Sequence, residues 1–275
     1  MNDLGRWTSW AADCWETARS AWLRRDGQDH YYRTTVVVPA LIHSSRRFLT
    51  TVRSLADLGS GDGFSTDCFV ASATKARERF EEIVLIDRSA EQLGYAVRRT
   101  NLRAARPVVR DLLQPGWAGL LHHLPTPTLL LSLFVFQELA SLTNPVTELA
   151  KALRPSDLAM LLVVAPSYAE TLRRRGLVRV VQKSPPGEHD WLWAGEYPIG
   201  AAGSSFVLPH FQRRTSDYSN AFRRAGLRLL EIRYLSVPDT TRAHRVFRSS
   251  VYDERILGVR SSLLFVVGKV KVNGP

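Results

Sequence analysis

The sequence is poor in cysteine and has no long hydrophobic run. Cys14 and Cys68 are its only cysteines, and they lie far apart in the chain. This excludes a disulfide framework and a cysteine-rich metal site, and we expect both residues to be buried as small apolar side chains. The longest apolar run, residues 129–136, is interrupted by Ser132 and is too short to cross a bilayer, and the N-terminus lacks the pattern of a signal peptide. These absences predict a cytoplasmic protein without membrane contact.

Lysine is also scarce, with five residues in a chain of 275 whose net charge is +11. Arginine therefore supplies most of the positive charge, and it is scattered along the chain, with local groups at 173–175 and 223–224. A positive charge of this size fits a polyanionic partner such as RNA. A preference for arginine codons explains the charge about as well. We therefore predict no nucleic-acid partner and keep RNA binding as the alternative.

The first 50 residues have the pattern of helices. Apolar residues recur at steps of three to four positions, which is typical of a helix with one buried face: Trp7, Trp10, Cys14, Ala18, Ala21 and Trp22. Pro39 suits the first turn of a second helix that runs to about Leu49. We predict that residues 1–50 form a helical cap packed on a main domain of residues 51–275. A helix that closes over the active site, or one exchanged within a homodimer, is the alternative.

From residue 54 onward, apolar strands alternate with amphipathic helices. The predicted strands are residues 54–59, 82–87, 107–112, 128–136, 159–165, 227–235 and 261–272, and the predicted helices are residues 65–80, 90–102, 145–153 and 215–226. Continuous apolar strands separated by helices are typical of a parallel sheet covered on both faces. The sequence therefore predicts a doubly wound, Rossmann-like α/β domain. Residues 168–214 break the alternation with a turn-rich stretch, which we interpret as a lid or mobile loop.

A glycine-rich turn follows the first predicted strand. In LADLGSGDG, residues 55–63, Gly59, Gly61 and Gly63 stand behind an apolar run that carries Asp57. Such a turn lets the backbone approach a ligand closely, and the helix that follows offers N–H groups to negative charge. Phe64 stands where a dinucleotide-binding turn has its third glycine, which argues against a dinucleotide.

Acidic residues follow at the ends of the next two strands. Asp87 ends the second strand, where a carboxylate can accept both hydroxyls of a ribose. Asp111 ends the third strand, within reach of the amine of a base, with the Leu112 N–H available to a ring nitrogen. Asp57 would face a cation. Each acid alone also fits a turn residue, but three in register predict a site for a nucleoside that carries an amino acid.

The region from about Leu55 to Val272 resembles the class I S-adenosylmethionine-dependent methyltransferases. ADLGSGDG resembles the first motif of that family, IVLIDRS its second-strand acid, VVRDLL its adenine contact and LSLFVFQEL its segment beside the sulfonium. The resemblance implies a seven-stranded sheet with an antiparallel last strand and S-adenosylmethionine as the cofactor. It further implies that Gly59 and Gly61 lie under the methionine part, Asp87 binds the ribose and Asp111 with Leu112 binds the adenine. The remaining cofactor-binding residues predicted in these motifs are Asp57, Ser60, Gly63, Arg88, Phe134 and Gln137.

Two flanking segments, YRTTVVVPAL and PHFQRRTSDYSNAFRRAG, resemble those of bacterial methyltransferases that act on small molecules, often in secondary metabolism. In such enzymes Tyr32 would lie over the cofactor and His210 would face the acceptor. The candidate general bases are His210, whose intrinsic pKa is suitable, Glu138 after the fourth strand, and His189 in the insertion. Their structural alternatives are a packed histidine, a helix-capping carboxylate and a solvated loop residue.

The insertion also carries Trp191 and Trp193, which either stack on a flat acceptor or pack within the lid. We predict no metal, because His189, Asp190 and Glu196 lack a second histidine or cysteine at ligand spacing. The sequence as a whole predicts methyl transfer to a small-molecule acceptor, in which a carbon, oxygen or nitrogen atom receives the methyl group. The alternatives are an RNA methyltransferase, a cyclase that keeps the cofactor without transferring methyl, and a dehydrogenase.

Overall fold

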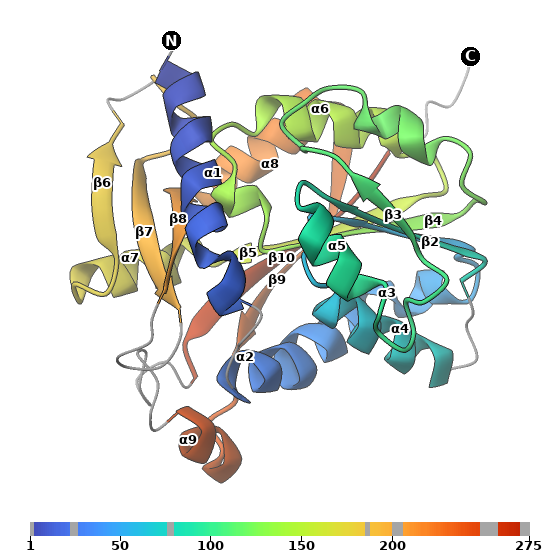
Figure 1. The fold of residues 1–275 in the computed structure, drawn as a ribbon, viewed down its shortest axis with the longest axis horizontal. Helices are drawn as coiled ribbons and strands as arrows, with labels where there is room; N and C mark the ends of the chain where they lie inside the picture. The colour runs from blue at the N-terminus through green and yellow to red at the C-terminus, as the bar shows by residue number, and fades with distance from the viewer. Residues whose placement is uncertain are drawn as a thin grey trace.

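The structure, a computed structural model, describes residues 3–22, 27–75, 80–184, 188–199, 206–247 and 258–269. Its centre is a mixed seven-stranded sheet with the strand order β3-β2-β1-β4-β5-β10-β9 (Figure 1). The strands are β1 (Ser54–Leu58), β2 (Glu82–Asp87), β3 (Arg106–Val109), β4 (Thr128–Leu133), β5 (Leu158–Val164), β9 (Leu227–Ser236) and β10 (Arg260–Lys269). The first five strands run parallel, and β10 runs antiparallel to both β5 and β9. The predicted Rossmann-like sheet with an antiparallel last strand is confirmed.

Helices cover both faces of this sheet (Figure 1). One layer contains α3 (Val38–Leu49), α4 (Phe64–Lys75) and α5 (Ala90–Ala96), and the other contains the 3-10 helix η2 (Trp117–Leu121), α6 (Thr143–Ala152), α7 (Pro166–Arg174) and α8 (Thr215–Arg224). In β5, Met160 and Leu162 pack toward the first layer, whereas Leu161 and Val163 pack toward the second. Because both faces of the strand are buried, the strand has to be apolar throughout, and this is the pattern that its sequence shows.

Some predicted boundaries differ from the observed ones. β3 ends at Val109, so Asp111 lies in the loop after the strand rather than at its end. α5 ends at Ala96, and the chain continues in turns to Ala104 instead of a helix to Leu102. Residues 270–272, predicted as the end of the last strand, lie outside the described residues.

The insertion of residues 168–214 is more ordered than a loop. After α7, its described residues form a three-stranded antiparallel sheet of β6 (Arg179–Lys183), β7 (Trp193–Ile199) and β8 (Phe206–Gln212). The insertion itself is confirmed as a small added sheet, and the mobile-loop alternative was wrong for these residues. Its prolines and glycines are typical of turns, whereas the apolar and aromatic residues between them are typical of strands. Residues 185–187 and 200–205 of the insertion lie outside the described residues.

The N-terminal helix α1 (Asp3–Trp22) packs on this small sheet (Figure 1). Trp7 and Ala11 are buried with Trp191 and Phe211 in one apolar cluster, and Trp7 meets the Trp191 ring edge-on at 5.5 Å. The predicted apolar face is therefore used for packing. The side chains of Ala21 and Trp22, also assigned to that face, lie outside the described residues.

After α1 come α2 (Gly27–Tyr32) and a π-helical turn η1 (Arg33–Val37), which leads directly into α3. Pro39 lies at the start of α3, as the sequence predicts. The π-helical turn widens the helix by one residue per turn at Arg33, and such widenings are frequent at functional sites. Cys14 and Cys68 are free thiols and are half-buried rather than fully buried.

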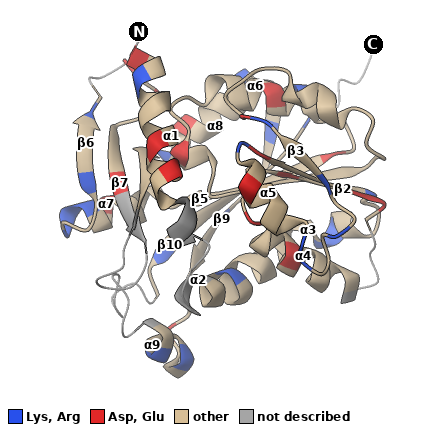
Figure 2. Ribbon diagram, viewed as in Figure 1, with Lys and Arg blue, Asp and Glu red and all other residues tan. Residues whose placement is uncertain are grey.

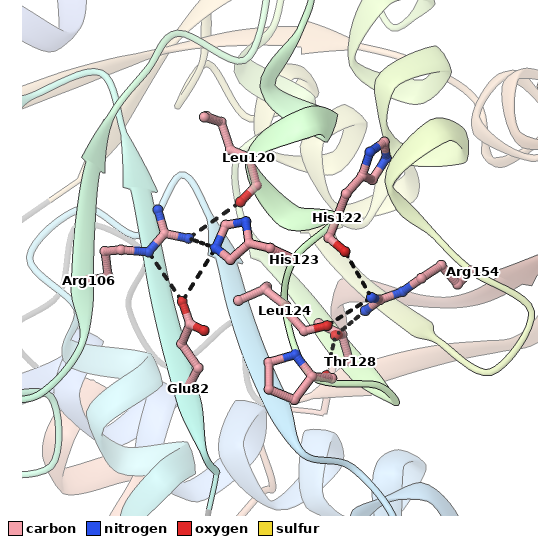
Figure 3. A network of polar contacts seen from close by, with 9 residues as sticks. Glu82, Arg106, Leu120, His122, His123, Leu124, Thr128 and Arg154 are labelled. Atoms are coloured by element: carbon pink, nitrogen blue, oxygen red, sulfur yellow. Dashed lines mark hydrogen bonds and ion pairs between the residues drawn. The ribbon is translucent and has the colours of Figure 1, made fainter.

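The amino-terminal edge of the parallel strands is closed by a polar network (Figure 3). Arg154 donates to the carbonyls of His122 and Leu124 and to the Thr128 hydroxyl, and Arg106 donates to Glu82 and contacts His123. Both histidines are exposed. This edge is therefore held by structural contacts, and the loops at the opposite edge are left to form a site.

Basic residues are distributed over several sides of the molecule. Figure 2 shows Lys and Arg on α3, α7, β6 and the helix α9 (Thr241–Phe247) rather than along one groove. In the group at 173–175, Arg173 and Arg174 both pair with Glu170 of the same helix. No helix in the described part of the chain is long and apolar enough to span a membrane.

Candidate functional site

A pocket lies at the carboxyl ends of the parallel strands, beneath α1. Its lining combines the glycine turn after β1, the ends of β2 and β4, the loop after β3 and one face of α1. Of the predicted cofactor-binding residues, nine line it: Asp57, Gly59, Ser60, Gly61, Asp87, Arg88, Asp111, Leu112 and Phe134. Glu138, a candidate base, lines it as well. Residues from four separate loops thus meet in one place, as expected where the carboxyl ends of parallel strands converge.

The glycine turn is held in place by backbone hydrogen bonds and by its lack of side chains. The N–H groups of Gly59 and Ser60 donate to the Ile86 carbonyl at 2.7 and 3.0 Å. Gly59 has a φ of +77°, and a Cβ there would lie 2.4 Å from Cγ2 of Val135. Both the left-handed conformation and the close approach of β4 therefore require glycine at this position.

Asp87 connects the turn to the end of β2. One of its carboxylate oxygens accepts a hydrogen bond from the Gly61 N–H and the other from the Ser89 N–H, both at 2.8 Å. Burial raises the pKa of Asp87, and these backbone hydrogen bonds oppose that rise. Asp111 accepts from the Leu113 N–H at 2.9 Å within the loop after β3 and also lines the pocket. Both carboxylates therefore face one common pocket from fixed positions.

Asp57 is the most deeply buried acid of the pocket. It is 3% exposed, and its Oδ2 accepts a hydrogen bond from the Thr66 hydroxyl, whereas its Oδ1 has no hydrogen-bond partner in the part of the chain that the structure describes. Burial raises the pKa of Asp57 to about 7, and the nearby charge of Asp87 adds to this rise. A buried carboxylate with an unused oxygen is costly unless a ligand provides a donor or a positive charge.

Two further pocket residues carry buried oxygens without partners among the described residues. These are the Ser60 hydroxyl and the Gln92 amide oxygen. Buried polar atoms in folded proteins are nearly always hydrogen-bonded, and the exceptions need an explanation. Three such oxygens around one pocket fit a polar ligand that supplies hydrogen-bond donors.

The segment that follows β4 forms a further wall of the pocket, beside the glycine turn. Phe134 has a φ of +64°, which is rare for a residue with a side chain and carries a conformational cost. Its N–H donates to the Leu162 carbonyl at 2.7 Å, and its carbonyl accepts from the Gln137 amide at 2.6 Å. These contacts hold the turn, so Gln137 supports the wall and does not line the pocket.

Glu138 lies beside this wall and faces α1. Its carboxylate accepts a hydrogen bond from the Trp15 indole N–H at 2.8 Å. Burial raises the pKa of Glu138 well above its ordinary value, and the Trp15 hydrogen bond and the positive charge of Arg33 oppose this rise. An acid with a raised pKa in a pocket is a candidate for proton transfer.

Besides Gln137, four predicted site residues do not line the pocket: Tyr32, Gly63, His189 and His210. Tyr32 packs its ring near Phe134 and bonds its hydroxyl to Ser261 and Ser262 of β10. A Cβ at Gly63 would lie 2.8 Å from the side chains of Ala96 and Leu102, so this glycine serves the packing of α4 on α5.

The two histidines lie in or near the small sheet. His210 is 2% exposed, its Nε2 lies 2.9 Å from the Gln212 amide oxygen, and burial lowers its pKa to about 4. His189 stacks on Trp191 at 4.3 Å and pairs with Asp3 at 2.8 Å. Trp191 and Trp193 are themselves buried in packing, so the lid-packing alternative describes them. The structure thus brings only Glu138 of the three candidate bases to the pocket.

Arg33 and Trp15 are pocket residues that the sequence reasoning missed. Arg33 is only 6% exposed, donates to the Ser65 hydroxyl at 2.6 Å and lies 5.4 Å from the centre of the Phe134 ring. The sequence did indicate Arg33, because it stands within the apolar helix pattern YRTTVVV. An arginine is rarely buried without a partner, so a buried one suggests a partner of opposite charge. For Trp15 no signal existed, because the indole contacts a residue 123 positions away.

Asp3, Glu188 and His189 are the described residues whose ligand atoms lie close enough to share a metal, within 4.8 Å of one another. Both acids are exposed, and the histidine already pairs with Asp3. Exposed carboxylates of this kind are common without a metal, and this group lies apart from the pocket lining.

The strand order, the reversed strand between β5 and β9, and the small added sheet define a Rossmann-like methyltransferase fold. The sequence matches no protein-family model and no curated protein. Among solved structures, an S-adenosylmethionine-dependent methyltransferase from Anabaena variabilis is similar, with 14% identity, 94% of this chain and 95% of that chain covered, and a TM-score of 0.57.

Two natural-product proteins are similar as well. The glycopeptide N-methyltransferase MtfA, in complex with sinefungin, has 13% identity and a TM-score of 0.53, with 85% of this chain and 86% of that chain covered. A protein described in the conversion of a disulfide bond into a thioacetal group during echinomycin biosynthesis has 14% identity and a TM-score of 0.50, with 84% and 81% covered. At these identities the likeness establishes the fold.

Proposed function

We propose that the protein is an S-adenosylmethionine-dependent methyltransferase that acts on a small-molecule acceptor. The observation that carries this proposal is the convergence of Asp57, Asp87 and Asp111 on one pocket together with a side-chain-free turn at Gly59. The similar structures support it through their fold and through the methyltransferase activity for which two of them are named.

The residues present fit this cofactor. The unused Oδ1 of Asp57 and the unused Ser60 hydroxyl offer acceptors to an ammonium group, and the buried guanidinium of Arg33 offers a partner to a carboxylate. Asp87 would accept from the ribose hydroxyls, and Asp111 with the Leu112 N–H would contact the base. A carboxylate and a guanidinium in the lining of one pocket match the two charged ends of an amino acid.

When bound, S-adenosylmethionine supplies a methyl group that is already activated by its sulfonium. The chain then has to orient the acceptor and exclude water. Orientation alone can lower the activation barrier by ~7–11 kcal/mol. Phe134, Leu139, Ala11 and Trp15 of the pocket lining supply apolar surface for this. Where the acceptor loses a proton, Glu138 is the residue placed to receive it, and a positioned base typically contributes ~10²–10⁴-fold.

A small acceptor, of the natural-product kind, is supported by two observations. α1 contributes Thr8, Ala11, Trp15 and Glu16 to the pocket lining, so this helix covers part of the pocket. Among the described residues, Lys and Arg lie on separate elements such as α3, α7, β6 and α9 (Figure 2), whereas a nucleic-acid site typically has them clustered on one face. The names of the glycopeptide and echinomycin proteins agree with such an acceptor.

Isothermal titration with S-adenosylmethionine and S-adenosylhomocysteine tests the proposal. We expect both to bind, and we expect Asp87→Asn to weaken binding more than tenfold, about 1.4 kcal/mol. Asp239→Asn removes an exposed carboxylate that is not part of the pocket and should leave the affinity unchanged. Absence of heat with both ligands would overturn the proposal. With an acceptor in hand, a product of unchanged mass that still requires the cofactor would point to the cyclase alternative.

A further inference from the structure

β9 is an end strand of the seven-stranded sheet, and within the described ranges no strand pairs with its outer edge. It is ten residues long and carries three large apolar side chains that are exposed to solvent: Leu230 at 39%, Ile232 at 42% and Tyr234 at 39%. Nowhere else in the described part of the chain do three exposed large apolar residues share one element. A long apolar edge strand is a template for pairing with another strand.

We propose that β9 pairs antiparallel with β9 of a second copy of this chain, about a two-fold axis that passes through Ile232. The two seven-stranded sheets would then form one continuous sheet across the dimer. This is an isologous interface, in which the same residues contribute from both subunits.

The sequence of β9 selects this register. In an antiparallel pair about a two-fold axis perpendicular to the sheet, residues at equal distances from the axis face each other on the same side of the sheet. With the axis at Ile232, the Ile232 side chains of the two subunits are neighbours. Glu231 then faces the partner's Arg233, and Arg233 faces the partner's Glu231. The central apolar pair is thus flanked by two opposite-charge pairs.

The neighbouring registers are worse. An axis at Glu231 places two carboxylates opposite each other, and an axis at Arg233 does the same with two guanidinium groups. An axis at Tyr234 sets Arg233 against Leu235. Cross-strand pairs of opposite charge or of apolar side chains stabilise a sheet, whereas like charges directly opposite destabilise it. The charges on β9 would repel each other in the two adjacent registers and would lack an opposite charge with the axis at Tyr234, so they favour the register with the axis at Ile232.

The existing contacts of these charges leave them available to a partner. Arg233 donates to Glu231 of its own strand at 2.7 Å, and Ser44 of α3 donates to the same carboxylate at 3.1 Å. Both charged side chains are half-buried on the α3 side of the sheet, about 30% exposed. A carboxylate accepts several hydrogen bonds and a guanidinium donates several. The partner's charges would extend this pair into a four-membered network with alternating signs.

A second copy is the occupant that this pattern favours. A strand from an unrelated protein would have to supply its own matching sequence, whereas β9 matches itself without any change. The pairing in β9 and β10 skips one position between Glu231 and Leu229, so Leu230 lies outside the regular ladder, and the register rests on Glu231, Ile232 and Arg233. The partner edge that β9 needs is therefore already present in every copy of the chain.

Light scattering coupled to size-exclusion chromatography tests the proposal on the full chain. We expect a mass twice that of one chain at micromolar concentration. Ile232→Lys should give a monomer with unchanged far-UV circular dichroism. The matched control is Val109→Lys, because Val109 is 59% exposed on β3 at the opposite edge of the same sheet and should leave the dimer intact.

Charge reversal gives the sharper test. Glu231→Arg and Arg233→Glu each turn both facing pairs into like-charge pairs, and each should weaken the dimer by about tenfold or more. The double variant E231R/R233E restores opposite charges and should dimerise as the wild type does. The two single variants mixed together should form a heterodimer, since every facing pair is then opposite in charge.

Three results would overturn the proposal: a wild-type monomer, a dimer that tolerates Ile232→Lys, or single charge variants that are not rescued by the double variant or by mixing. A monomer would leave the proposed methyl transfer untouched, because no β9 residue lines the pocket.

Discussion

Replacing Asp57 by asparagine should stabilise the protein at neutral pH and weaken its binding of S-adenosylmethionine. In the folded chain Asp57 is buried, receives a hydrogen bond from Thr66 and has one unused oxygen. Asparagine has nearly the same shape, and its amide oxygen still accepts the Thr66 hydrogen bond. The variant therefore removes a buried charge without opening a cavity.

The magnitude follows from the pKa of Asp57, which burial raises from an ordinary 3.8 to about 7. An acid with a raised pKa binds its proton more tightly in the folded state than in the unfolded state, so the free energy of unfolding falls as the pH rises from 3.8 to 7. The full effect corresponds to about 4 kcal/mol. Between pH 5 and 8 the wild type should lose about 2–3 kcal/mol from this group, and Asp57→Asn should not lose it.

Urea unfolding of both ligand-free proteins, followed by circular dichroism at pH 5 and pH 8, measures this difference. Other groups with shifted pKa values are the same in both proteins and cancel in the comparison. Titration calorimetry on the same samples should show that Asp57→Asn binds S-adenosylmethionine more weakly, because the ammonium group loses its carboxylate partner. Equal pH dependence of stability in the two proteins would refute the reasoning, as would a variant that binds the ligand as tightly as the wild type.

Three further outcomes are expected. Burial lowers the pKa of His210 to about 4 from 6.5, so the stability that this residue contributes is full above pH 6.5 and is lost as the pH falls toward 4. In urea unfolding, His210→Gln should remove about 2 kcal/mol from the difference in stability between pH 7.5 and pH 5. An unchanged difference would argue against a lowered pKa of His210. Gly63→Ala should destabilise the fold by about 2 kcal/mol more than Gly226→Ala. Both glycines have positive φ, but of the two only Gly63 has side chains 2.8 Å from an added Cβ. Equal unfolding midpoints of the two variants would contradict this. Trp15→Phe removes the 2.8 Å hydrogen bond that lowers the pKa of Glu138, so the acid limb of the kcat/KM profile should move to higher pH, and an unmoved limb would mean that Glu138 is not the base.

The seven-stranded sheet was largely predictable from the sequence. Each buried strand is a short apolar run, and each helix that follows has one apolar face, so the order of elements is written locally. The converging acids were predictable for a related reason: the carboxyl ends of parallel strands meet at one edge, so Asp57, Asp87 and Asp111 had to lie near one another once the sheet was recognised. The boundary of β3 was missed because Asp111 lies in a turn that the strand pattern does not mark.

The roof and the inner wall of the pocket were decided by tertiary structure. Trp15 meets Glu138 across 123 positions, and Arg33 is placed by a π-helical turn that no periodicity announces. His210 looks like a base in the sequence, yet burial in the small sheet turns it into a packed, neutral side chain. Local patterns in a sequence determine which elements form and which of their faces are buried. Which side chain meets which across the pocket depends on how those elements pack, and packing is the sum of contacts between residues far apart in the chain.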